Sequence, residues 1–259
     1  IEEGDNRKYK YVGNLLSPNS VGSSDWADRQ YDMGFNQLYE ATVDYAGQWD
    51  KHSLVAVAGF SYQHFMDDGL KAANKGFVMP SLKYYSIGEG DASKDNLSTS
   101  SWRNSHALAA AFARVNYNYD DKYLFSVSLR AEGSSRFGAN NKWGYFPSVA
   151  FAWTASNEKF MEKYRDVISN LKLRTSYGVI GNQDIAPYST LALMSQTTTY
   201  FGSNTGVTGY WANTLATPDI KWEKTNQFDI GFDLGLWDNR LTLSFDYFDK
   251  RTTDALLST

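Results

Sequence analysis

The sequence predicts an all-β protein: an antiparallel wall of a transmembrane β-barrel, with about eight strands, long extracellular loops and one short periplasmic helix. Most expected strands alternate apolar and polar residues with a period of two, which is typical of a strand with one dry face. Connections alternate between short and long, as in bacterial outer-membrane barrels, where short turns face the periplasm. No run approaches the roughly 18 consecutive apolar residues of a transmembrane helix, so any membrane crossing must be by strands.

One hairpin with a markedly apolar outer face is expected between Asp121 and Ser156. Odd positions from Tyr123 to Ala131 are aromatic or apolar, whereas Ser126, Ser128 and Arg130 lie between them, and residues 143–154 form a matching return strand. Aromatic residues near both strand ends, with aliphatic residues between them, are typical of the girdles of an outer-membrane barrel. We therefore predict four membrane-interface aromatics: Tyr123, Trp143, Tyr145 and Trp153.

The same alternation predicts strands at 37–45, 53–65, 106–117, 171–179, 228–236 and 241–248. Short turns are expected at 48–51, 119–122 and 237–240, and long loops at 1–35, 66–103, 133–142 and 181–220. After Thr154 the period changes. Ser156 or Asn157 is a candidate N-cap before apolar residues at helical spacing, so a short helix is expected at about 158–167.

Composition excludes several functions for this chain of 259 residues. A formal charge of -4, with basic residues scattered among acidic ones, provides no stripe for nucleic acid. There is no cysteine, and the three histidines lack neighbours at metal-ligand spacing. Residues 91–96, DASKDN, lack the turn glycine and closing glutamate of a calcium loop. We therefore expect no metal, no cofactor and, without a Ser-His-Asp arrangement, no catalytic residue.

Three stretches resemble the C-terminal barrel of SusC/RagA-type TonB-dependent transporters: SLRAEGSSRFGANNKWGYFPSVAFAW (128–153), LKLRTSYGVIGNQDI (171–185) and KWEKTNQFDIGFDLGLWDNRLTLSFDYFDKRTTDAL (221–256). Their order and spacing match as well. Ala131-Glu132 stands where this family usually has Arg-Asp, and Ala255 where leucine is common.

The resemblance implies a barrel of about 22 strands in the outer membrane of a Gram-negative bacterium. It also implies a plug domain, energy from the TonB complex, and a SusD-like surface lipoprotein that helps to capture oligosaccharides or peptides. The chain is too short for all of this, so we expect residues 1–259 to be a partial barrel domain without the plug. Its expected partners are the lipoprotein, the TonB complex, the remaining barrel and plug segments and outer-membrane lipid.

Aromatic residues of the expected outer loops are candidates for stacking on sugars or peptide side chains. They are Tyr84, Tyr85, Trp102, Tyr200, Phe201, Tyr210 and Trp211. The alternative is that they pack the loops together or against the lipoprotein. Charged residues of the polar strand faces could contact substrate, or could line a wet lumen or contact a plug: Glu40, Asp44, Arg130, Lys172, Arg174, Asp229, Asp233 and Asp246.

Two other architectures would also produce the alternation. One is a self-contained eight-stranded outer-membrane barrel, and the other is a secreted soluble β-sandwich that binds glycans. A partial wall should instead have edge strands, near Tyr39 and Phe245, that do not pair with each other.

Overall fold

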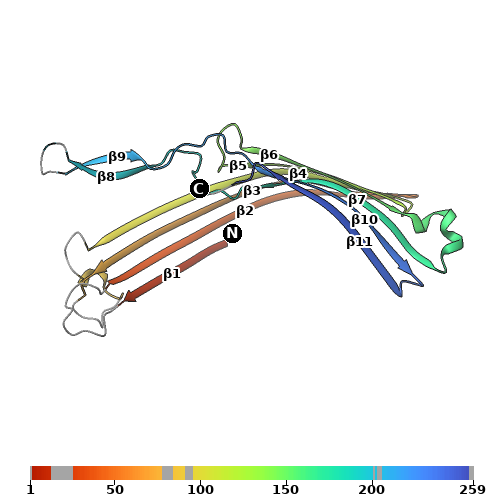
Figure 1. The fold of residues 1–259 in the computed structure, drawn as a ribbon, viewed down its shortest axis with the longest axis horizontal. Helices are drawn as coiled ribbons and strands as arrows, with labels where there is room; N and C mark the ends of the chain where they lie inside the picture. The colour runs from red at the N-terminus through yellow and green to blue at the C-terminus, as the bar shows by residue number, and fades with distance from the viewer. Residues whose placement is uncertain are drawn as a thin grey trace. The chain divides into compact units, whose positions relative to one another are not determined.

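The computed structural model describes residues 2–12, 26–77, 84–90, 96–200, 202 and 206–256. Nine antiparallel strands form one sheet in the order β1-β2-β3-β4-β5-β6-β7-β10-β11, and β8 and β9 form a separate hairpin (Figure 1). The strands of the large sheet are β1 (Glu2–Val12), β2 (Trp26–Trp49), β3 (His52–Lys75), β4 (Ser98–Tyr119), β5 (Tyr123–Ser134), β6 (Trp143–Thr154), β7 (Ile168–Asn182), β10 (Glu223–Leu236) and β11 (Leu241–Thr253). The strands of the hairpin are β8 (Met194–Tyr200) and β9 (Gly206–Ala212).

The strand order is open, beginning at β1 and ending at β11. For the described residues this excludes an eight-stranded barrel that closes on itself. It also excludes a sandwich, because all nine strands lie in one sheet. On the first side the terminal strand is β1, which pairs with only the first part of β2, from Glu2 opposite Asn36 to Val12 opposite Trp26. This register ends before Tyr39, so it does not cover the predicted edge there. Phe245 does lie on the terminal strand β11.

The chain divides into two compact units. One unit comprises residues 1–38 and 63–106, with β1, parts of β2 to β4 and the 3₁₀ helix η2 (Ile87–Glu89). The other comprises residues 39–62 and 107–259 and contains eight strands of the sheet together with the β8–β9 hairpin. This second unit holds the features described next.

One face of the second unit is apolar and the other is polar, as the alternation predicts. On the apolar face Phe125 lies opposite Phe151, and Val127 lies opposite Val149. Further along the sheet Leu173, Phe232 and Phe245 lie in one row. The opposite face has serine, arginine and aspartate in the corresponding rows. In a sheet that crosses a membrane, the apolar face contacts lipid and the polar face lines the lumen.

Hydrogen bonds and ion pairs join the short turns of the second unit. The N–H of Asp120 donates to the carbonyl of Lys51 (2.7 Å), and the N–H of Thr154 donates to the carbonyl of Lys122 (2.7 Å). The Asp120 carboxylate pairs with both Lys51 (3.0 Å) and Lys122 (3.2 Å), and Lys122 also reaches Glu158 (3.5 Å). Three successive connections are therefore fastened together along this end of the sheet.

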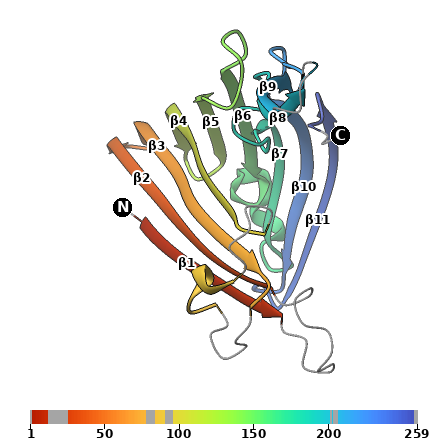
Figure 2. The same ribbon diagram turned by 90° about the vertical axis from the view of Figure 1, so that its left-hand side faces the viewer.

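At the long-loop end of the same unit, a small core joins segments that are far apart in the sequence. Phe137, Phe146 and Trp222 are buried against one another, with ring centroids 5.0 Å (Phe137–Trp222) and 5.2 Å (Phe146–Trp222) apart. The Trp222 indole N–H donates to the carbonyl of Lys142 (2.9 Å), and Arg136 donates to the carbonyl of Gln183 (3.3 Å). The three family-like stretches therefore meet at this core. Figure 2 shows the β5–β6 turn and the β8–β9 hairpin at the same end.

Several predicted loops are shorter than expected because strands extend into them. Residues 1–35 contain β1 and the start of β2, and the expected 66–103 loop is reduced to 76–97 by the ends of β3 and β4. The 181–220 loop contains β8 and β9. These segments lack the regular alternation of apolar and polar residues from which a strand is recognised.

The helix expected at 158–167 takes the form of two short 3₁₀ helices, η3 (Ala155–Asn157) and η4 (Lys159–Tyr164). The predicted caps are wrong: Thr154 and Glu158 precede the two helices, and neither side chain makes a capping hydrogen bond. Glu158 instead accepts a hydrogen bond from the Tyr123 hydroxyl (2.7 Å), which draws its carboxylate toward the sheet. Within the described residues, no helix is long and apolar enough to cross a membrane.

Candidate functional site

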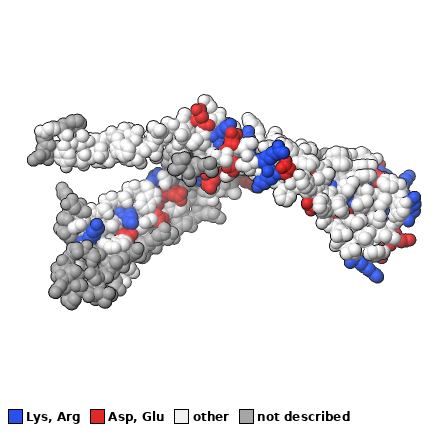
Figure 3. All heavy atoms as spheres, viewed as in Figure 1, with Lys and Arg blue, Asp and Glu red and all other residues white. Residues whose placement is uncertain are grey.

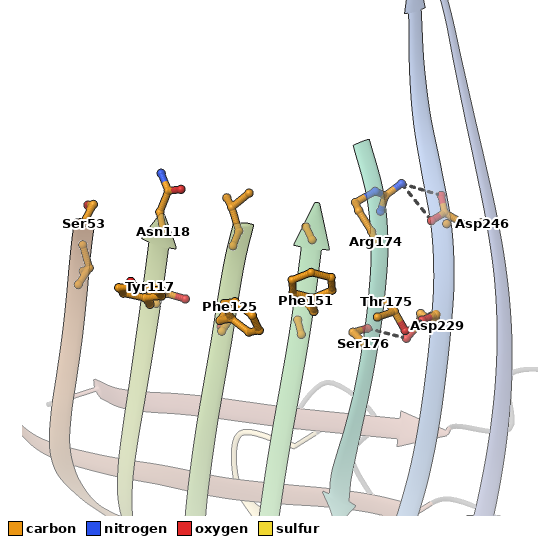
Figure 4. Close-up of a pocket in the computed structure, with 17 residues that line it drawn as sticks. Ser53, Tyr117, Asn118, Phe125, Phe151, Arg174, Thr175, Ser176, Asp229 and Asp246 are labelled. Carbon is orange, nitrogen blue, oxygen red and sulfur yellow. Dashed lines mark hydrogen bonds and ion pairs between the residues drawn. The ribbon is translucent and has the colours of Figure 1, made fainter. Parts of the chain in front are cut away.

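The polar face of the second unit contains a pocket of about 460 Å³ near the short-turn end. It spans seven neighbouring strands, from β3 to β11, and Figure 4 shows its side chains on successive strands. The strand register places most of its lining in three successive rows. The middle row contains Tyr117, Phe125, Phe151 and Thr175, and the rows on either side of it belong to the polar face. Of those two rows, one contains Asn118, Leu124, Ala152, Arg174, Gly231 and Asp246, and the other contains Asn116, Ser126, Ala150, Ser176 and Asp229.

Arg174 is the central charge of this pocket. Its Nε lies 2.8 Å from Asp233 Oδ2, and its Nη2 lies 3.1 Å from Asp246 Oδ1. The three residues come from three neighbouring strands, β7, β10 and β11. Ser244 donates a further hydrogen bond to Asp233 (2.8 Å). The guanidinium therefore shares two carboxylates and is held in one orientation across the strands.

Gly231 leaves room for Asp246 to approach Arg174. It lies between Arg174 and Asp246 in the strand register, and a Cβ at this position would collide with the Asp246 carboxylate. The same Cβ would lie 2.7 Å from the carbonyl oxygen of Phe245. This oxygen belongs to the backbone of β11, so it could not shift without disturbing the strand. A side chain at 231 would therefore displace Asp246 from Arg174.

A second acidic group, Asp229, lies two rows further from the short turns. It accepts a hydrogen bond from the Ser176 hydroxyl (3.2 Å; Figure 4) and another from the Gln227 amide (2.9 Å). Hydroxyl and amide groups of the other strands surround these charges. The pocket can therefore hold a polar group by hydrogen bonds and charge, on a wall braced by its own ion pairs. Among the described residues, no three His, Cys, Asp or Glu side chains are grouped to hold a metal.

The eight polar-face charges named from the sequence thus separate in the structure. Arg174, Asp229 and Asp246 line the pocket, and Asp233 completes the ion-pair network. Arg130 instead pairs with Glu132 (2.6 Å) and lies 5.8 Å from the centre of the Phe112 ring. Sequence reasoning missed the neutral lining, above all Asn116 and Asn118. Their alternation with Val115 and Tyr117 was the signal that could have placed them on the same face.

The loop aromatics named from the sequence are divided between the two units. Tyr84 and Tyr85 pack on each other in the first unit, with ring centroids 4.6 Å apart. The placement of Trp102 in a loop is wrong. It belongs to β4, and its indole lies over Gly69 of β3. Phe201 lies outside the described residues.

Tyr200, Tyr210 and Trp211 lie on the β8–β9 hairpin of the second unit and are all exposed. In its register Tyr200 is opposite Gly206 and Tyr210 is opposite Gln196, so Tyr200 and Tyr210 share one face, whereas Trp211 lies on the other. The hairpin therefore presents aromatic rings on both faces.

The predicted interface aromatics lie at the two ends of the β5–β6 hairpin. Tyr123 is opposite Trp153 at the short-turn end, where both side chains donate to Glu158. Trp143 and Tyr145 are exposed at the long-loop end. All four lie on the apolar face, which is the arrangement of a strand pair with a ring at each membrane interface.

Comparisons with known proteins agree with this architecture. The curated relatives include TonB-dependent receptor P3 of Formosa agariphila, which is 38% identical over 93% of this chain. TonB-dependent receptor SusC of Bacteroides thetaiotaomicron is 30% identical over 94% of the chain. The chain spans 24% of the length of each of these relatives.

Among solved structures, that of the RagAB peptide transporter matches 99% of this chain with a TM-score of 0.82 and 27% identity, and the chain covers 28% of it. The RagAB peptide importer in its open-open state matches 96% of the chain with a TM-score of 0.79 and 28% identity. The family model described as TonB dependent receptor-like, beta-barrel matches residues 3–259.

These matches agree with the open antiparallel sheet, its apolar outer face and the short turns at one end. The chain belongs to the TonB-dependent receptor β-barrel family and is a barrel segment of the SusC/RagA type, in the outer membrane of a Gram-negative bacterium.

Proposed function

We propose that this chain forms part of the wall of a transporter that imports oligosaccharides or peptides with a SusD-like surface lipoprotein and energy from the TonB complex. The observation that carries the proposal is the likeness of nearly the whole chain to the wall of the RagAB peptide transporter. In this proposal residues 1–259 are one partial barrel domain. The plug and the remaining strands belong to other parts of a longer protein.

The long-loop end is where a ligand and the lipoprotein would meet this wall. The β8–β9 hairpin supports this role, because Tyr200, Tyr210 and Trp211 are solvent-exposed on a hairpin whose base is fixed by the Trp222 core. Exposed aromatic rings on a rigid support suit both sugar stacking and protein contact. Tyr84, Tyr85 and Trp102 are further candidates on other segments, and Phe201, next to Tyr200 in the sequence, is another.

The test uses the complete transporter in cells that depend on a single glycan or peptide source. Tyr210→Ala combined with Trp211→Ala should reduce uptake and co-purification of the surface lipoprotein, while the amount of assembled barrel stays unchanged. Tyr247→Ala is the matched control, since Tyr247 is similarly exposed (57% against 66% for Tyr210) but lies on the apolar face of β11. Normal uptake and lipoprotein capture by the double variant would refute the role of the hairpin. Failure of the unmodified transporter to import either class of molecule would refute the function.

A further inference from the structure

The connection between β6 and β7 exposes large apolar side chains at the short-turn end of the second unit. Phe160, Tyr164 and Val167 are 58%, 47% and 48% exposed, and Trp237 in the neighbouring β10–β11 turn is 51% exposed. Of the residues of η4, only Met161 is buried. Connections that contacted only water would gain no stability from exposing four large apolar side chains.

These side chains continue the apolar face beyond the ends of the strands. The Phe160 ring lies 6.4 Å from Trp153, whose cross-strand partner is Tyr123. Tyr123 lies 6.4 Å from Tyr119, and Tyr119 lies 5.0 Å from His52, centroid to centroid. His52 in turn stacks on Trp49 at 5.9 Å. A band of rings thus runs along the short-turn end of the lipid-facing side, and Phe160 extends it.

The β10–β11 turn is held beside this connection. The N–H of Trp237 donates to the carbonyl of Val167 (2.9 Å), and the N–H of Asp238 donates to the Ser169 hydroxyl (2.7 Å). These bonds fix Trp237 next to Val167. The exposed apolar residues of two connections therefore form one surface.

Basic side chains accompany this surface. Lys159, Lys163, Arg165 and Arg240 have no ion-pair partner within the described part of the chain. The Lys163 ammonium lies 4.8 Å from the centre of the Tyr164 ring. Acidic neighbours are also present: Glu162, Asp166 and Asp238. Figure 3 shows charged atoms at this end of the molecule beside a surface that carries few of them. Aromatic rings with basic side chains at their edge suit the boundary between lipid acyl chains and phosphate head groups.

We propose that Phe160, Tyr164, Val167 and Trp237 form a membrane foot. The foot inserts into the head-group boundary of the periplasmic leaflet, and Lys163 and Arg165 contact lipid phosphates. Its occupant is the lipid surface itself, because the foot continues directly from the lipid-facing rings of the wall. The foot anchors the β6–β7 connection and sets how deeply this part of the wall sits in the bilayer.

The test places nitroxide labels on the complete transporter in vesicles of phosphatidylethanolamine and phosphatidylglycerol. Single-cysteine variants Phe160→Cys and Tyr164→Cys carry the label within the foot, and Glu162→Cys and Asp166→Cys carry it at the matched polar positions. Labels at 160 and 164 should collide more with oxygen, which concentrates in lipid, than with a water-soluble nickel chelate, and labels at 162 and 166 should show the reverse. Equal access of the nickel chelate at all four positions would overturn the proposal.

A second measurement tests the head-group contact. In vesicles with phosphatidylglycerol the transporter should unfold at a higher temperature than in vesicles without it, and Lys163→Gln with Arg165→Gln should remove roughly half of this shift, because two of the four basic residues are lost. Lys250→Gln on β11 is the control and should leave the shift unchanged. An unchanged shift in the double variant would refute the contact. Label depth does not depend on transport, so it separates failure of the foot from failure of the proposed function.

Discussion

Trp222→Ala should release the base of the long β7–β10 connection while leaving the wall intact. Trp222 is 4% exposed and packs on Phe137 and Phe146, and its indole N–H donates to the carbonyl of Lys142. The backbone near Pro218 also lies so close to Gly138 that no side chain fits there. Trp222 therefore joins the β5–β6 turn to the start of β10, the strand that follows the β8–β9 hairpin.

Truncating a buried tryptophan costs about 3–5 kcal/mol, of which the lost hydrogen bond accounts for about 1 kcal/mol. Because 1.4 kcal/mol is a factor of ten, the population of the open loop base should rise roughly 100-fold or more. The opening is local, since the strand ladders of β5 to β7 do not depend on this ring.

Hydrogen exchange of the complete transporter measures this opening. The amides of Ser134 and Asn141, bonded to the carbonyls of Lys142 and Gly138, should exchange roughly 100-fold faster in Trp222→Ala. The amide of Trp237, at the other end of the sheet, should not change. Trp222→Phe keeps most of the packing and should show only about a fivefold effect. Trp211→Ala removes an indole that is 53% exposed, and it should change nothing at the loop base. If Trp222→Ala behaves like Trp211→Ala, the core does not hold the loop.

Two other predictions concern the faces and the short-turn end. Val127→Arg puts a charge on the lipid-facing side and should cost about 2–4 kcal/mol of folding free energy in vesicles, whereas Ser128→Arg on the polar face should assemble normally; equal losses would contradict the assignment of the faces. The hydrogen bond that Lys51 donates, followed by that from Lys122, lowers the pKa of Asp120, and the hydrogen bond from the Tyr123 hydroxyl lowers the pKa of Glu158. The two carboxylates therefore stabilise the folded state at pH values above the ordinary carboxyl pKa of about 4. This stabilisation is lost as the pH falls through their lowered pKa values in the folded state. The unfolding temperature should drop on acidification below pH 4, and Asp120→Asn with Glu158→Gln should flatten that drop; an unchanged pH profile would show that these pairs do not stabilise the end of the sheet.

The sequence predicted the strands whose two faces meet different surroundings. Phe228 to Leu236 and Leu241 to Tyr247 alternate because lipid meets one face and a polar space meets the other, and their pairing follows from that pattern. The first halves of β2 and β4 could not be found in this way, because residues such as those of 98–106 are polar on both faces. The 3₁₀ form of residues 159–164 was hidden for another reason. The spacing of Phe160 and Tyr164 is typical of one face of an α-helix. The same spacing also results when the two rings face the membrane boundary, so it did not distinguish the two cases.

The candidate site was predictable only in part, because it depends on register. Alternation places Arg174, Asp229 and Asp246 on the polar face, but nothing in the sequence shows that Arg174 and Asp246 meet across Gly231. That meeting requires the lengths of the turns and the stagger of three strands, which are long-range properties of the sheet. The loop aromatics were chosen from residue type and loop position alone. In the structure Tyr84 and Trp102 belong to one compact unit and Tyr210 belongs to the other.

The place where the three family-like stretches meet determines which parts of this wall are held rigidly. If these stretches only supplied alternating strand residues, many apolar residues would serve equally well, and a turn that buries Phe137 against Trp222 would be unnecessary. They converge instead on the Phe137, Phe146 and Trp222 core at one end, whereas ion pairs of Asp120 and Glu158 fasten the other. Between these two fastened ends lies the polar face with the Arg174 network, and beyond the core lies the exposed β8–β9 hairpin. Because the wall is fixed at both ends, the sequence of the exposed loop can change without altering the lumen of the barrel. Relatives can therefore differ in the ligand that they bind through changes in the hairpin, while the strands stay the same.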